Sequence, residues 1–154
     1  MSYGCRIDGD DVSPLHYAVD CNSLNTVSAL LSARQEFPEI VSQALARVDK
    51  KKSGYAPLHN ALRHRYTRVA RLLIEAGADV NMVCGESVIT PLELAIWTRN
   101  VDAVQLLLQS PGCQVDKVGS GSATALLHAT HESKITLLCT LCTLCYVVDD
   151  CVSR

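Results

Sequence analysis

Residues 54–81 have the sequence GYAPLHNALRHRYTRVARLLIEAGADVN, which contains the pattern of two short helices joined by a turn. Pro57 fits the first turn of a helix, where its missing N–H is not needed and its φ is already helical. The Leu and Ala positions that follow form the apolar stripe of this helix. A second stripe lies at 69–74 and ends near Gly77, which readily takes the left-handed conformation at a helix end. The stretch therefore predicts a helix pair whose apolar faces must be covered by other parts of the chain.

The same pattern recurs along the chain. The four matching segments are SPLHYA (13–18), APLHNA (56–61), TPLELA (90–95) and TALLHA (124–129). The last three begin 34 residues apart, and the first begins 43 residues before the second. A Leu-rich pair follows each segment at the same distance, and a Val-Asp or Val-Asn pair closes each unit. Since neither helix of a unit can bury its stripe alone, each unit must stack on the next.

In these marks the chain resembles the ankyrin repeats, and residues 54–81 are similar to the family consensus over their whole length. The resemblance implies an all-α repeat solenoid, in which antiparallel helix pairs joined by extended finger loops stack into a slightly curved array. We expect a single domain over residues 1–154. Its four repeats are expected at approximately 8–49 with an insertion at 32–47, then 50–81, 82–116 and 117–149. The resemblance also implies that His16 and His59 hold the helix-starting turns together and are not catalytic or metal-binding.

Departures from the pattern predict where the units differ. The insertion in the first unit is either a lengthened second helix or an outer loop, and Pro38 predicts a new helical turn that runs to Ala46. Ser13 and Thr90 precede the motif proline and can cap a helix with a hydroxyl, whereas Ala56 cannot. We therefore expect a weaker cap in the second unit. In the third unit, Glu93 stands where the motif histidine would be.

The composition excludes several classes of protein. The 154 residues are enough to bury a core, and 48% hydrophobic with only 5% aromatic residues favours closely stacked helices. The net charge of −2 gives no global field, so no nucleic-acid partner is expected. The longest uncharged apolar stretch, 135–148, falls short of the roughly 20 residues that span a bilayer. Residues 1–11 do not resemble a signal peptide. We therefore expect no membrane span and a cytoplasmic protein, with the nucleus as the alternative location.

Catalytic chemistry is not predicted. The sequence has no phosphate-binding loop, no nucleophile elbow and no paired carboxylates at a plausible spacing, so we expect a non-enzyme without a cofactor. Four of the eight cysteines form one cluster, Cys139, Cys142, Cys145 and Cys151. Thiolates three residues apart can share a helix face and bind zinc. In the repeat register, however, Cys142 takes a core leucine position. Structural thiols are the favoured interpretation, and a metal- or redox-responsive protein is the alternative.

The resemblance also implies where a partner binds, because ankyrin-like stacks usually present finger tips and exposed first-helix positions on their concave side. The candidate partner-binding residues in this register are Asp20, Lys52, Tyr55, Arg63, His64, Glu86, Ile89, Trp97 and His131. Because Trp, Tyr and Arg dominate interface hot spots, Tyr55, Arg63 and Trp97 are the leading anchors. The alternative for Trp97 is packing against a neighbouring unit.

The second unit is also basic. Its cationic residues are Lys50, Lys51, Lys52, Arg63, Arg65, Arg68 and Arg71. They could meet an acidic partner segment or a phosphate. We place Arg65, Arg68 and Arg71 largely on the second helix of the unit, where a solvated face is favoured over a nucleic-acid site.

The predicted function is a non-catalytic protein–protein interaction module that acts as adaptor, scaffold or inhibitor. The alternatives are the metal- or redox-responsive protein described above and a truncated substrate-receptor subunit of a ubiquitin ligase that lacks its docking box. The last unit, 117–149, has an apolar second helix with little charge, whereas terminal repeats need a polar outer face. We therefore also expect a capping partner or self-association at that end.

Overall fold

The structure, a computed structural model, describes residues 13–33, 36–46, 54–85, 88–117 and 119. These residues form seven α-helices and one isolated antiparallel bridge between Cys84 and Ile89. The helices are α1 (Pro14–Asp20), α2 (Leu24–Ser32), α3 (Pro38–Ala46), α4 (Pro57–Arg63), α5 (Thr67–Glu75), α6 (Pro91–Trp97) and α7 (Val101–Leu108). All but the first positions of the predicted fourth unit lie outside the described residues.

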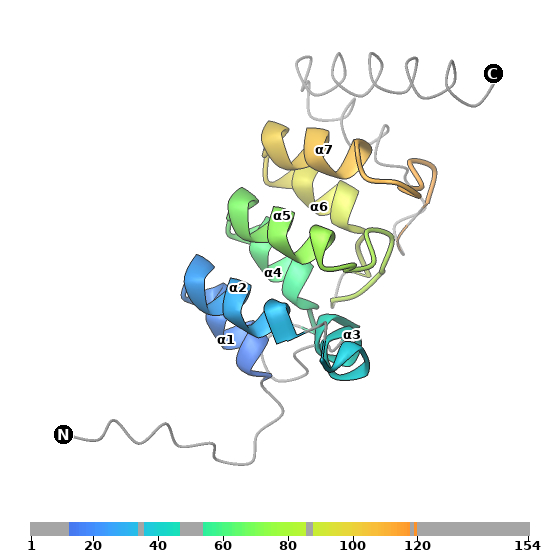
Figure 1. Cartoon of the computed structure of the whole chain (residues 1–154). Coiled ribbons are helices and arrows are strands. Elements are labelled where there is room, and N and C mark those ends of the chain that lie inside the picture. Colours follow the sequence, from blue (N-terminus) through green and yellow to red (C-terminus); the bar gives the residue numbers. More distant parts are fainter. Residues whose placement is uncertain (1–12, 34–35, 47–53, 86–87, 118, 120–154) are drawn as a thin grey trace.

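Six of the helices form three stacked pairs, which we call unit one (α1 and α2), unit two (α4 and α5) and unit three (α6 and α7) (Figure 1). The first helices contact one another in order, α1 with α4 and α4 with α6, and the second helices α2, α5 and α7 do the same. The predicted all-α repeat stack is therefore confirmed.

Equivalent positions of successive units build the core. Leu62 and Ile96 lie 34 residues apart on α4 and α6, and both are fully buried. Leu73 and Leu107 have the same relation on α5 and α7. Each such side chain contributes about 2 kcal/mol by leaving water. The apolar stripes recognised in the sequence are thus the surfaces on which the units stack.

The first helices begin with different caps. The Ser13 hydroxyl accepts a hydrogen bond from the N–H of Leu15 at 3.3 Å. In α6 the Thr90 hydroxyl accepts from the N–H of Glu93 at 3.2 Å, and the Glu93 carboxylate accepts from the N–H of Thr90 at 2.7 Å. Ala56 makes no such cap, as its side chain predicts. Its own N–H donates instead to the sulfur of Cys84 at 3.3 Å.

The turns between paired helices repeat one conformation. Asn22, Arg65 and Arg99 occupy the same place in units one, two and three, and their φ angles are 51°, 60° and 55°. This left-handed region favours glycine, or asparagine among other residues. Arg65 therefore lies in the turn before α5 and not on the helix, which corrects its expected position. Gly77, with φ of 88°, ends α5 as predicted.

The insertion forms the separate helix α3, which begins at Pro38 and ends at Ala46, as its sequence predicts. Val41 and Leu45 are buried, whereas Ile40 and Phe37 are 64% and 53% exposed. Figure 1 shows α3 beside the stack, on the side where the loop after α5 projects. The insertion thus places an additional helix beside unit one and leaves the stacking of the units unchanged.

Candidate protein-binding face

Each first helix is joined to the loop of the next unit by a side chain at the same motif position. The Nε2 of His16 lies 3.1 Å from the carbonyl oxygen of Tyr55, and the Nε2 of His59 lies 3.1 Å from that of Ile89. Glu93 takes this place in α6, where its carboxylate accepts a hydrogen bond from the N–H of Gly119 at 3.3 Å. The motif side chains therefore connect neighbouring units, a wider role than holding their own helix-starting turn.

The imidazole of His59 is fixed on both sides. A carbonyl can only accept, so Nε2 carries the proton donated to Ile89, and Nδ1 accepts from the thiol of Cys84 at 3.1 Å. Burial lowers the pKa of His59 to about 4, against the opposing effects of the Ile89 carbonyl and the charge of Asp79. Burial also raises the pKa of the Cys84 thiol. The pair is thus a neutral histidine beside a protonated thiol, a structural contact and not an activated nucleophile.

Tyr55 connects this buried pair to the surface. Its ring stacks on His59 with centroids 6.0 Å apart and an interplanar angle of 13°. The guanidinium carbon of Arg63 lies over the same ring, 5.6 Å from its centroid, in the range of a cation–π contact. Gly85, with φ of 87°, leaves room for the ring, because a Cβ there would collide with it. The ring of Tyr55 therefore supports the guanidinium of Arg63. Because Tyr55 itself is half-buried, it is less exposed than expected of a binding anchor.

The ends of the first helices expose the remaining candidates. Trp97 ends α6 and is 57% exposed, and Arg63 holds the equivalent position at the end of α4. Asp20, at the end of α1, is half-buried. His64 is exposed and stacks on Tyr66, with ring centroids 5.5 Å apart. An acid, a base and an aromatic side chain thus follow one another across three units.

Ile89 was predicted to join this surface, and that prediction is wrong. Its side chain is only 8% exposed and belongs to the core. Its backbone pairs with Cys84 and accepts from His59, which turns the side chain inward. The other candidates Lys52, Glu86 and His131 lie outside the described residues, as do Cys139, Cys142, Cys145 and Cys151.

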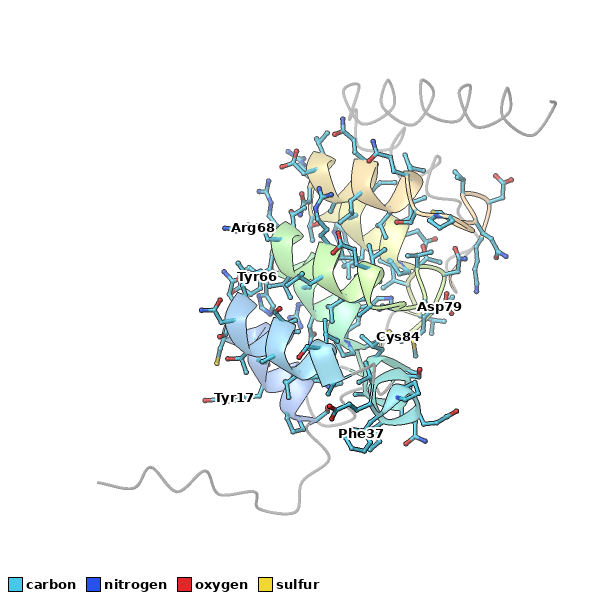
Figure 2. All side chains as sticks on the ribbon, viewed as in Figure 1. Tyr17, Phe37, Tyr66, Arg68, Asp79 and Cys84 are labelled. Carbon is cyan, nitrogen blue, oxygen red and sulfur yellow. The ribbon has the colours of Figure 1, made fainter. Side chains whose placement is uncertain are left out.

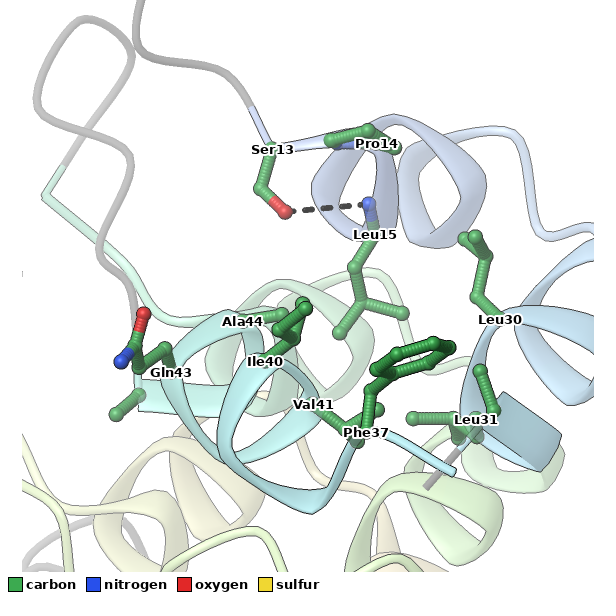
Figure 3. A pocket seen from close by; sticks show the side chains of 12 residues that line it. Ser13, Pro14, Leu15, Leu30, Leu31, Phe37, Ile40, Val41, Gln43 and Ala44 are labelled. Carbon is green, nitrogen blue, oxygen red and sulfur yellow. Dashed lines mark hydrogen bonds between the residues drawn. The ribbon is translucent and has the colours of Figure 1, made fainter. Parts of the chain in front are cut away.

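One concave feature was not foreseen from the sequence. Between α1, α2 and α3 lies a groove of about 670 Å³ with mostly apolar walls (Figure 3). Leu30 and Leu31 line it from α2, and Ile40 and Val41 from α3. Phe37 and Ile40, three residues apart in the insertion, are the apolar residues that could have indicated this groove in the sequence. It was missed because the groove exists only once α3 has packed beside unit one.

Two further findings on the described residues concern metal binding and membrane spans. No three His, Cys, Asp or Glu side chains among them gather as a metal-binding group. Within the same part of the chain, no helix has both the length and the hydropathy needed to cross a membrane.

Comparison with known proteins identifies the class. A family model for ankyrin repeats in three copies matches residues 32–119, and a model for the single ankyrin repeat matches 10–40. The chain belongs to the ankyrin repeat family. Ankyrin repeats in general are typically non-catalytic and mediate protein–protein interaction.

Similarity to a named protein covers a shorter stretch. BRCA1-associated RING domain protein 1 of Caenorhabditis elegans is 34% identical over 61 residues, which are 40% of this chain. The match covers 9% of that protein, so the chain corresponds to only a small part of its length.

Proposed function

We propose that this chain is a non-catalytic interaction module that binds a protein partner on the face formed by the ends of α1, α4 and α6. The observation that carries the proposal is the exposure of Trp97 beside the positioned Arg63, at equivalent places of two stacked units. Tryptophan and arginine are the side chains most enriched among residues that dominate binding energy. Adaptor, scaffold and inhibitor roles all use such a surface.

Rigidity of the backbone supports the proposal. The side chains of His16, His59 and Glu93 each reach the following loop, so the exposed residues are held on fixed helices. A surface that is ordered before binding loses less conformational entropy on association. Burial lowers the pKa of His59 and raises the pKa of the Cys84 thiol, so this pair offers no activated nucleophile to an alternative enzymatic role.

The test is an affinity capture from cell lysate with quantitative mass spectrometry. The full chain is compared with Arg63→Ala/Trp97→Ala and with the control Arg71→Ala/Gln105→Ala, whose positions are exposed on α5 and α7. All three are first shown to be folded by circular dichroism. We expect proteins retained by the wild type and the control to be lost from the first variant. Equal retention by all three would contradict this face as the binding site.

A further inference from the structure

The turn before α5 and the turn before α7 are tied to each other. Asn100 donates from its side-chain nitrogen to the Thr67 hydroxyl at 3.0 Å, and this hydroxyl also lies 3.3 Å from the amide oxygen of Asn100. The same oxygen caps α7 by accepting from the N–H of Ala103 at 3.2 Å. Asn100 is only 4% exposed, whereas Thr67 is half-buried. The two turns therefore form one fixed edge of the stack.

Arginines gather along this edge. Arg65 and Arg99 precede the linked residues Thr67 and Asn100 by two positions and one position, and both are exposed. Neighbouring helices pack at roughly 10 Å, so these equivalent arginines lie about that far apart at their backbones. The guanidinium of Arg63 is not part of this edge, because it lies over the ring of Tyr55, which packs against Gly85 near the N-terminal end of α4. Figure 2 places Tyr66 and Arg68, which flank the first of these turns, on the opposite side of the stack from Asp79 and Cys84.

The choice of residue at these turns costs stability. Arg65 and Arg99 have φ angles of 60° and 55°, in a region where a side chain other than glycine or asparagine is strained. Unit one meets the same requirement with Asn22, at a φ of 51°. Folding alone thus favours asparagine or glycine at all three turns. An arginine at an exposed position where folding favours another residue raises the question of what its charge contributes.

The charge of the edge is positive. Its described ionic groups are three arginines, Arg65, Arg68 and Arg99, and two aspartates, Asp20 and Asp102. Asp20 ends α1 in unit one, and Asp102 lies in the first turn of α7, where it favours the helix dipole. Trp97 adds a large exposed apolar surface to the same edge.

We propose that this edge, which we call the turn patch (Arg65, Trp97 and Arg99), binds an acidic segment of a protein partner. Guanidinium groups pair with carboxylates in a bidentate manner, and Trp97 receives an apolar side chain next to the acids. The arginines are spread over two units and do not converge on one point, which suits a run of carboxylates better than a single phosphate. This inference rests on the proposed function and names the chemistry of the partner.

The first test is a selection from a random peptide display library on the full-length chain, followed by affinity measurement with the most enriched peptide. We expect enrichment of peptides with several Asp or Glu residues beside an aromatic or aliphatic residue, and affinity that falls as salt is raised. No excess of acidic residues among the selected peptides, or no enriched peptide at all, would overturn the inference.

The second test uses Arg65→Asn/Arg99→Asn, which removes the charge and relieves the strained turns. We expect the dissociation constant for that peptide to rise about tenfold, while the midpoint of thermal unfolding rises by a few degrees. Arg71→Asn, at an exposed position of α5 outside the patch, is the control that removes one arginine by the same substitution, and it should change affinity by less than about twofold. Unchanged binding by the double variant, once its unfolding midpoint has shown that it is folded, would refute the role of these arginines.

The last experiment distinguishes carboxylate recognition from phosphate recognition. It also distinguishes failure of this inference from failure of the proposed function. The same peptide is made with phosphoserine in place of each acid, and binding of this form alone would overturn the assignment to carboxylates. If the lysate capture finds partners that depend on Trp97 but not on salt or the turn arginines, only this inference fails. If the capture finds no partner that depends on this face, the proposed function fails with it.

Discussion

The first helices of units two and three begin with different chemistry and reach the same geometry. In α4 the cap position is Ala56 and the motif position is His59, which donates to the carbonyl of Ile89. In α6 the cap is Thr90 and the motif position is Glu93, which accepts from the N–H of Gly119. The polarity of the link between units is therefore reversed. In both units the side chain at this position is hydrogen-bonded to the following loop, and the backbone group that it meets there decides whether it donates or accepts.

Each unit also completes its link differently. In unit two, the thiol of Cys84 comes from the following loop and contacts both His59 and the N–H of Ala56. Unit three caps its first helix locally, because Thr90 and Glu93 satisfy each other's backbone N–H groups, and only its link to Gly119 reaches the next loop. Unit two therefore depends on a residue 28 positions away, whereas the helix start of unit three is encoded within four residues.

The largest effect is expected from removing the donor in unit two. His59→Ala leaves a cavity in a fully buried site and removes one of the two donors to the carbonyl of Ile89, which keeps only the N–H of Cys84, so we expect a loss of about 3 kcal/mol in the free energy of unfolding. His59→Gln, which can still donate to that carbonyl, should recover part of the loss. Urea denaturation of the three proteins measures both quantities. Equal losses in the two variants would show that the hydrogen bond contributes nothing beyond packing.

Lowering the pH should weaken unit two through the same side chain. The unfolded imidazole takes up a proton near pH 6.5, whereas folded His59 stays neutral until its pKa of about 4. The unfolded state then binds more protons, so the free energy of unfolding falls between pH 6.5 and pH 4, by about 3 kcal/mol in total. This contribution is fully present above pH 6.5 and does not change further below pH 4.

The pH effect is isolated by comparing wild type with His59→Gln. Urea unfolding at pH 7.5 and pH 4.5 gives the loss for each protein, and other titrating groups cancel in the difference. The wild type should lose more stability than the variant. The prediction is contradicted if acid weakens the two proteins by the same amount.

A smaller effect is expected from the corresponding change in unit three. Glu93→Ala removes the acceptor for the N–H groups of Thr90 and Gly119, while the Thr90 hydroxyl still caps α6. We expect a loss of about 2 kcal/mol. Glu93→Gln keeps an acceptor oxygen and should cost about half as much. If Glu93→Ala lowers the free energy of unfolding by as much as His59→Ala, or by more, then the helix start of unit three is not the more tolerant of the two.

The smallest loss of stability is expected from removing the thiol of Cys84. Cys84→Ala removes its contact with His59 and with the N–H of Ala56, and we expect a loss of about 1 kcal/mol. Cys21→Ala, at an exposed free cysteine, is the matched control and should change stability by less than about 0.5 kcal/mol. Thermal unfolding of both variants tests this, and indistinguishable midpoints would remove Cys84 from the account of unit two.

The sequence predicted local features well and long-range ones poorly. Pro38 marked the start of α3, and Ala56 indicated the missing cap, because both depend on the residue itself. The compensation by Cys84 could not be predicted, since it comes from a loop that meets Ala56 only in the folded stack. Ile89 was misplaced for a related reason, because its burial follows from the pairing of its backbone with Cys84.

The candidate site divides in the same way. Trp97 and Arg63 were found by counting along the repeats, and both lie on the exposed ends of their helices. The supporting position of Tyr55 and the tie between Thr67 and Asn100 are contacts between elements, which no single repeat contains. Register therefore predicts which residues share a face, and packing decides which of them are positioned and which are free to bind.

The most direct measurement of partner binding on this face is photo-crosslinking in cells. The full chain is expressed with Trp97→p-benzoylphenylalanine or, as the control, with Gln105→p-benzoylphenylalanine on the outer face of α7, and crosslinked products are identified by mass spectrometry. We predict a defined protein adduct from position 97 that is absent or much weaker at position 105. Adducts at position 105 but not at position 97 would contradict the assignment of the binding face.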